Sequence, residues 1–184
     1  MDIAKDLFYA QQTLFSLFSV TNKLQIQGDK QLGDMTLRQV LGIPSLFHAP
    51  DGRATINHIA RSMGTSKQNA KQIVDTLVKK GYLSVMKSDQ DKRAVNVTIT
   101  PEGQQAFQLC SERTDIFLAA MFNGFTAQEL ETLCGLLQKL YRFDGAPQGE
   151  FDHIRYHAND AATILQHHPS FAKRRAASAE KESK

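Results

Sequence analysis

Polar side chains with the chemistry to contact DNA are concentrated in one short stretch, residues 65–72. Lysine can donate to phosphates or to guanine O6 and N7, whereas glutamine and asparagine can form paired hydrogen bonds with adenine N6 and N7. Lys87 follows in the next apolar stretch, and Lys92 and Arg93 lie in the charged segment after it. Together the candidate DNA-contacting residues are Thr65, Ser66, Lys67, Gln68, Asn69, Lys71, Gln72, Lys87, Lys92 and Arg93.

Two short helices must position the first of these groups. Residues 55–63 carry apolar residues at helical spacing, with Thr55 as a suitable N-cap, and Gly64 tolerates the positive φ of a turn. A second amphipathic helix over about 66–80 follows at once and carries the candidates on its polar face. This order predicts a helix-turn-helix, although taken alone a face rich in lysine and glutamine also fits an ordinary solvated helix.

Both ends of the second helix carry sequence signals. Thr65 with Gln68 three residues later predicts a capping box at its start. Gly81 suits the left-handed conformation that closes a helix. In helix-turn-helix proteins the first residues of the second helix reach the base edges, so we expect residues 66–72 to read the major groove. The stripe expected to be buried consists of Ala70, Ile73, Val74, Leu77 and Val78.

An alternation of apolar and polar residues over 82–87, and again over 95–100, predicts two antiparallel strands joined by a charged loop. Such a hairpin can place a guanidinium in a narrow minor groove, where negative potential is concentrated. Lys92 and Arg93 are the candidates for that contact, and Asp91 can hold Arg93 in position through an ion pair. The alternative is an exposed turn whose charges only keep the chain in solution, but its place directly after a basic helix favours a wing.

Basic charge is concentrated in this region. Between Arg61 and Arg93 the chain has eight lysines and arginines but three acids, a net charge of +5, whereas all 184 residues together carry +3. A local excess of this kind is the electrostatic pattern expected of a nucleic-acid-binding surface.

Three ordered groups of residues resemble the MarR family of bacterial transcription regulators: Gly81-Tyr82-Leu83, the pair Asp91 and Arg93, and Thr100-Pro101-Glu102-Gly103. The resemblance covers about residues 36–103. It implies a homodimer of roughly triangular outline, with the helix at 66–80 in the major groove and the wing in the minor groove. It also implies repression, or sometimes activation, that a small ligand or oxidation relieves. By position, Asp91 and Arg93 match the wing pair of the family.

The expected fold is mostly α-helical with a small β-hairpin wing, in one winged helix-turn-helix regulator domain over residues 1–144. Its DNA-binding lobe lies at about 36–103, and Pro44 should kink or break a helix near 43–44. Apolar stripes over about 3–27 and 104–143 fit either a core within one chain or dimerisation helices that pack against a second copy. A twofold dimer would match a pseudo-palindromic operator.

A C-terminal extension occupies residues 145–184. Its last part, residues 169–184, is small, polar and basic, which predicts disorder. Two roles are open for the extension: it could brace the dimer, or it could add non-specific DNA affinity through Lys173, Arg174 and Arg175.

Other chemistry has weaker support. We expect Cys110 and Cys134 to be buried, reduced structural thiols because they lie among apolar residues. His153 and His157 can share one helix face toward a metal, but this spacing signal is weak. Motifs of nucleotide-binding proteins and hydrolases are absent from the sequence, so we expect no enzyme, cofactor or metal site. Without a signal peptide or a transmembrane stretch, we expect a cytoplasmic protein that contacts no membrane.

The main prediction is therefore a homodimeric DNA-binding repressor whose effector the sequence does not identify. Two alternatives remain open. One is a winged-helix module that binds another protein, because fold does not fix function. The other is a regulator that responds to thiol oxidation or to a metal.

Overall fold

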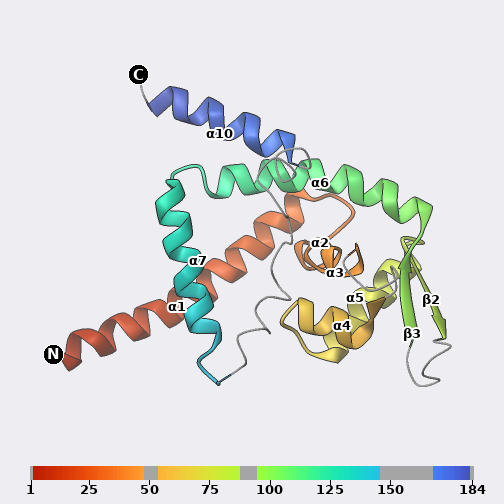
Figure 1. The fold of residues 1–184 in the computed structure, drawn as a ribbon, viewed down its shortest axis with the longest axis horizontal. Coiled ribbons are helices and arrows are strands. Elements are labelled where there is room, and N and C mark those ends of the chain that lie inside the picture. Colours follow the sequence, from red (N-terminus) through yellow and green to blue (C-terminus); the bar gives the residue numbers. More distant parts are fainter. Residues whose placement is uncertain (1, 48–53, 88–94, 146–167, 183–184) are drawn as a thin grey trace.

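The computed structural model of the chain describes residues 2–47, 54–87, 95–145 and 168–182 (Figure 1). The expected class is confirmed, because helices dominate and a small antiparallel sheet forms the wing. The elements are α1 (Ile3–Gln31), α2 (Leu37–Gly42), α3 (Pro44–Phe47), β1 (Ala54–Thr55), α4 (Ile56–Ser62), α5 (Lys67–Lys79), β2 (Leu83–Lys87), β3 (Val95–Ile99), α6 (Pro101–Met121), α7 (Ala127–Tyr141) and α10 (Pro169–Glu182).

The sheet has the strand order β1-β3-β2, with both pairs antiparallel. The alternation in the sequence predicted β2 and β3, which pair from Leu83 opposite Ile99 to Lys87 opposite Val95. The third strand, β1, was not predicted because its two residues are too few to show a period of two. Ala54 and Val97 face each other across β1 and β3, and both are fully buried.

The core of the DNA-binding lobe lies where α4, α5 and the sheet meet. Ala70, Val74 and Leu77 of α5 are buried, as predicted. Ile73 and Val78 were also predicted to be buried, but Ile73 is only half-buried and Val78 is 36% exposed. Four residues advance a helix by slightly more than one turn, so Val78 lies about 40° around α5 from Val74. That rotation places Val78 farther from the side on which Ala70 and Leu77 lie. The buried arc of α5 is therefore narrower than its apolar stripe.

Pro44 ends one helix and begins another, as predicted. The helix α2 stops at Gly42, Ile43 follows as its C-cap, and α3 starts at Pro44. Proline has no N–H to donate and fits the first position of a helix, where that donor would lack a partner. At the break, the hydroxyl of Ser45 donates a hydrogen bond to the Gly42 carbonyl at 2.6 Å.

The long flanking helices leave most of their apolar residues exposed. Helix α1 runs further than expected, to Gln31, and Gly28 is its one buried residue, while α7 has none. A core within one chain therefore does not account for the apolar stripe of α7 in the described part of the molecule. The exposed apolar side chains include Phe8, Phe15, Phe18, Leu136, Leu137 and Leu140.

The prediction of a disordered tail was wrong for Pro169–Glu182, which form the helix α10. Its alanines, lysines, arginines and glutamates have high helix propensity, and tertiary contacts can stabilise a helix that its composition leaves marginal. Figure 1 shows α10 lying along α6, on the side away from α4 and α5. Among the described segments, no helix is both long and apolar enough to cross a bilayer.

Candidate nucleic-acid interface

The turn between α4 and α5 fixes where α5 begins. Gly64 has a φ of 58°, and the N–H of Thr65 donates to the Ala60 carbonyl at 2.9 Å. This is the hydrogen-bond pattern of a Schellman closure at the end of α4. Thr65 therefore belongs to the end of α4, and the predicted capping box of Thr65 with Gln68 was wrong.

Ser66 caps α5 instead. Its hydroxyl oxygen accepts a hydrogen bond from the Asn69 backbone N–H at 3.2 Å. The side-chain amide of Asn69 in turn donates to Oγ1 of Thr65 at 3.3 Å. These contacts tie the start of the helix to the turn and hold the Asn69 side chain in a defined direction.

The predicted base-reading residues are open to solvent. Thr65 is half-buried, while the other members of the group on α5 and its cap are exposed: Ser66, Lys67, Gln68, Asn69, Lys71 and Gln72. The apolar side of α5 is held in the core, so the polar N-terminal half projects outward. In helix-turn-helix proteins this half of the helix contacts base edges.

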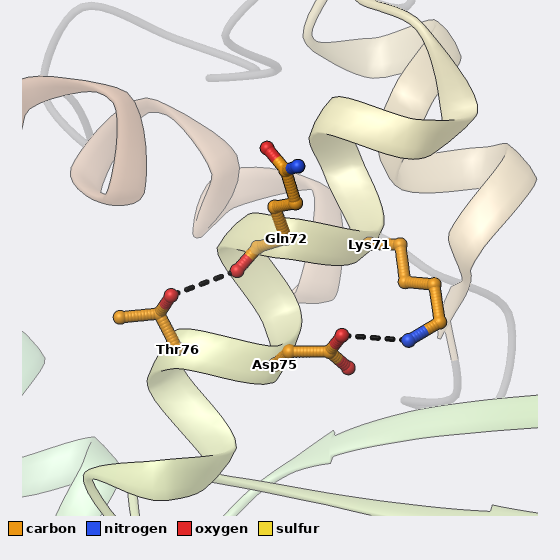
Figure 2. Close-up of polar contacts among 4 residues, drawn as sticks. All are labelled: Lys71, Gln72, Asp75 and Thr76. Atoms are coloured by element: carbon orange, nitrogen blue, oxygen red, sulfur yellow. Dashed lines mark hydrogen bonds and ion pairs between the residues drawn. The ribbon is translucent and has the colours of Figure 1, made fainter.

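An acidic residue that was not among the predicted site residues accompanies Lys71. This residue is Asp75. The Lys71 ammonium lies 2.6 Å from Oδ2 of Asp75, and both side chains are well exposed (Figure 2). The Thr76 hydroxyl donates to the Gln72 carbonyl at 2.8 Å on the same stretch of helix. An exposed pair at this spacing contributes about 0.3–0.5 kcal/mol. The approach of a phosphate can therefore redirect Lys71 at small cost.

An open cleft of about 280 Å³ lies beside α5. Arg38 of α2 lines it, with Nε donating to Oε1 of Gln25 at 2.8 Å. Sequence reasoning missed Arg38 because no local signal connects it with a recognition helix that begins only at Lys67. The residues lining the cleft are Gln25, Thr36, Arg38, Gln39, Asn69, Gln72, Ile73 and Thr76.

The wing is described up to the last residue of β2 and from the first residue of β3. Lys87 is exposed at the end of β2, opposite Val95. Across the same two strands, Oγ of Ser84 and Oγ1 of Thr98 share a hydrogen bond of 2.7 Å. The predicted wing residues Asp91, Lys92 and Arg93 lie outside the described residues, so their roles remain predictions.

Two of the three sequence groups that suggested a family meet in space. The Thr100 hydroxyl donates to the Gly81 carbonyl at 2.6 Å, and its oxygen accepts from the Gly103 N–H at 3.0 Å. The Thr100 N–H donates to the Tyr82 carbonyl at 3.1 Å. A Cβ on Gly103 would collide with that carbonyl, so the close approach requires glycine. This junction fastens the end of α5 to the start of α6.

The two thiols differ, against the prediction that both are buried. Cys110 is buried on α6, whereas Cys134 is exposed on α7, the helix that buries no residue in the described chain. Burial raises the pKa of the Cys110 thiol, and the nearby Arg113 guanidinium opposes that rise. His153 and His157 lie outside the described residues, so the structure does not address their suggested metal site.

Comparison with known proteins gives a consistent result. Residues 46–94 match the model described as the MarR family. The chain is 24% identical over 144 residues to YpoP of Bacillus subtilis, named as a helix-turn-helix-type transcriptional regulator, an alignment that covers 76% of this chain and 97% of YpoP. The proteins matched here are named as regulators of transcription, not as enzymes.

Two solved structures have the same fold. A mutant form of Escherichia coli MarR in complex with operator DNA aligns with a TM-score of 0.63 at 24% identity, covering 73% of this chain and 97% of that one. Bordetella bronchiseptica BpsR, whose DNA binding is described as regulated by 6-hydroxynicotinic acid, aligns with a TM-score of 0.63 at 18% identity and covers 71% of this chain and 98% of that one.

Proposed function

We propose that this chain, which belongs to the MarR family of transcription regulators, is a homodimer that binds a specific DNA sequence and represses transcription until a small ligand weakens its grip. The observation that carries the proposal is the exposed polar half of α5. It projects from a buried core, begins at a tight glycine turn and is followed by a β-hairpin. This arrangement leaves α5 free to enter a groove of DNA.

Within the complex, the N-terminal half of α5 lies in the major groove. Lys67 and Lys71 contact phosphates or guanine edges, and Gln68 and Asn69 contact adenine edges. The wing then reaches the adjacent minor groove with Lys92 and Arg93, which Asp91 orients. Lys87, exposed at the base of the wing, adds a phosphate contact.

The dimer is supported by the exposed apolar surface of α1 and α7. Phe15 and Phe18 of α1 are 67% and 66% exposed, and Leu136 of α7 is 59% exposed. Large apolar side chains exposed in such number on two helices indicate an interaction site. A second copy related by a twofold axis would cover both surfaces and would present two α5 helices to a pseudo-palindromic operator.

Ligand control is supported by the cleft beside α5. Its volume, about 280 Å³, lies near the lower end of the range for small-molecule sites, about 300–1,000 Å³. Arg38 supplies a guanidinium that suits a carboxylate, and Asn69 and Gln72 line the same space. A small organic acid held there would compete with DNA for the side chains of α5. BpsR, whose DNA binding is described as regulated by 6-hydroxynicotinic acid, offers a precedent for this class of ligand.

The test begins with selection of binding sites from a random DNA library, followed by affinity measurements at several salt concentrations. Lys67→Ala should weaken binding to all sequences and reduce the salt slope by about one. Gln68→Ala should cost about 1–3 kcal/mol and relax preference at one base position. Lys5→Ala removes an exposed lysine at the start of α1, outside α5 and the wing, and should leave both quantities unchanged.

The alternative functions predict different results. If the wild-type chain retains no DNA at low salt but captures a protein partner, the chain is a protein-interaction module. If Lys67→Ala and Gln68→Ala leave selected-site affinity intact, α5 is not the reading element. If affinity for DNA changes on adding peroxide or zinc, but not on adding small organic acids, the thiol- or metal-responsive alternative is favoured.

A further inference from the structure

We propose that Arg175 is a positioning residue that sets the distance between the two DNA half-sites, because it fixes the corner between α6 and α7. This inference rests on the proposed function as a homodimeric DNA-binding regulator. It assigns a task to α10, the C-terminal helix that the sequence predicted to be disordered.

The side chain of Arg175 binds the corner directly. One terminal nitrogen donates to the Phe122 carbonyl at 2.6 Å and to the Asn123 carbonyl at 3.4 Å, and the other donates to the Phe125 carbonyl at 2.6 Å. These carbonyls belong to the C-cap of α6 and to the turn that leads into α7. The last carbonyls of a helix carry partial negative charge and lack helical partners, so a forked cation is well suited to bind them.

A second contact anchors the start of α10 to the middle of α6. Nδ1 of His168 lies 2.5 Å from Oδ1 of Asp115, whose side chain is buried with 2% exposed. Asp115 and Phe122 are seven residues apart, as are His168 and Arg175, and both contacts join residues 53 positions apart. Residues seven apart share one helix face. The two helices therefore run in the same direction, in register, and α10 is held at two points.

Within the described residues, buried packing does little to fix this corner. There α7 buries none of its own side chains, so packing among these residues does not define its direction. The exposed apolar row of α7, including Leu136 and Leu140, is surface that the second copy would cover. The angle at the corner thus decides where the twofold axis lies relative to the rest of the chain.

The other end of α6 is fastened to the DNA-reading elements. Thr100, the N-cap of α6, donates to the Gly81 carbonyl at the end of α5. A change in the corner angle therefore moves α5 relative to the twofold axis, and it moves the partner's α5 in the opposite sense. The earlier suggestion that Arg175 adds non-specific DNA affinity is replaced, because its guanidinium is bound at the corner and α10 lies on the side of α6 away from α5 (Figure 1).

The experiment measures preference for half-site spacing. A site selected from a random library by the wild-type chain is rebuilt with one base pair added or removed between its half-sites. Each base pair shifts one half-site by about 3.4 Å along the axis and rotates it by about 34°. We expect the wild-type chain to prefer its selected spacing by roughly tenfold.

Arg175→Ala should reduce that preference to roughly twofold, while affinity for the best spacing falls by less than about threefold. Arg175→Lys keeps the charge but cannot span three carbonyls, so its preference should lie between the two. Lys173→Ala, on the exposed side of the same helix, should behave as the wild type. A general loss of folded protein would lower affinity at every spacing equally, so a change in preference separates positioning from stability.

A wild-type spacing preference in Arg175→Ala, with the variant folded and dimeric by circular dichroism and sedimentation, would overturn the inference and leave the proposed function intact. If Arg175→Ala does not assemble, Arg175→Lys decides, and unchanged preference in that variant overturns the inference. If the wild-type chain selects no paired half-sites, the proposed function itself fails.

Discussion

Replacing Gly103 with alanine tests the junction between the recognition helix and α6. Gly103 is the third residue of α6, and its N–H donates to the Thr100 hydroxyl at 3.0 Å. An added Cβ would lie far inside van der Waals contact with the backbone carbonyl of Tyr82. Because the obstacle is main chain and not the end of a flexible side chain, α6 must move away from the end of α5.

The expected cost follows from what that movement breaks. Overpacking typically costs about 1–3 kcal/mol. Separating Thr100 from Tyr82 and Gly81 weakens two more hydrogen bonds, each worth about 1 kcal/mol. Alanine recovers up to about 1 kcal/mol through its higher helix propensity. The net loss of unfolding free energy should be about 2–4 kcal/mol, which corresponds to a fall in melting temperature of roughly 5–15 °C.

Chemical and thermal unfolding followed by circular dichroism measure this loss. Gly135→Ala is the matched control, since it lies within α7 and a Cβ there meets no heavy atom of the described chain within 4 Å. That variant should be unchanged or more stable by up to about 1 kcal/mol. If Gly103→Ala unfolds with a free energy within about 0.5 kcal/mol of the wild type, the usual size of a surface effect, the junction is not tight.

Three further predictions concern the flanking helices and their thiols. Replacing Phe15 and Phe18 together with alanine should raise the dimer dissociation constant by roughly a hundredfold or more, because each fully buried phenylalanine contributes about 1.5–3 kcal/mol. Lys23→Ala, also exposed on α1, should leave the dissociation constant unchanged. Sedimentation at several concentrations would contradict the interface if the double variant, Lys23→Ala and the wild type behaved alike. In the folded chain, one thiol should react promptly with a thiol reagent, and this fast reaction should be lost in Cys134→Ser. Cys110 should react slowly because it is buried and its pKa is raised. A fast reaction in Cys134→Ser would refute this. The ordinary pKa of the thiol is 9.0, and the folded chain holds the Cys110 proton to a higher pH than the unfolded chain does. As the pH rises past 9.0, the contribution of Cys110 to the free energy of unfolding should therefore fall.

Local signals in the sequence predicted the elements that depend on one or two residues. Gly64 and Gly81 both adopt the positive φ that closes a helix, and Pro44 divides α2 from α3. The alternation of apolar and polar residues predicted both long wing strands, and the exposed face of α5 carries the residues expected there. In each case the physical cause is steric or periodic and acts within a few positions of the chain.

The errors arose where a contact elsewhere decided between local alternatives. Thr65 and Ser66 are both good N-caps, and the choice fell to Ser66 because the N–H of Thr65 is used to close α4. Val78 belongs to the apolar stripe, but the elements packed on α5 cover a narrower arc. Cys134 has apolar neighbours in sequence, yet among the residues that the structure describes α7 packs against too little to bury it.

The prediction of disorder for the tail was the largest error. It rested on a composition that gives little apolar surface to drive packing. Its order comes from polar contacts with partners about fifty residues earlier, the Asp115 carboxylate and the carbonyls at the end of α6. A local reading of the sequence cannot reveal that a basic side chain such as Arg175 reaches backbone carbonyls at the end of α6. Low hydrophobicity predicts disorder only when a segment has no such partners.

The contacts at the two ends of α6 have a common consequence. At its start, Thr100 and Gly103 join it to the backbone of Gly81 and Tyr82, so the end of α5 cannot move without it. At its end, Arg175 holds the turn into α7. A helix of 21 residues fixed at both ends transmits displacement along about 30 Å with little loss. The proposed dimer surface and the proposed DNA-reading surface should therefore move together, and Gly103 and Arg175 should affect DNA binding without contacting DNA.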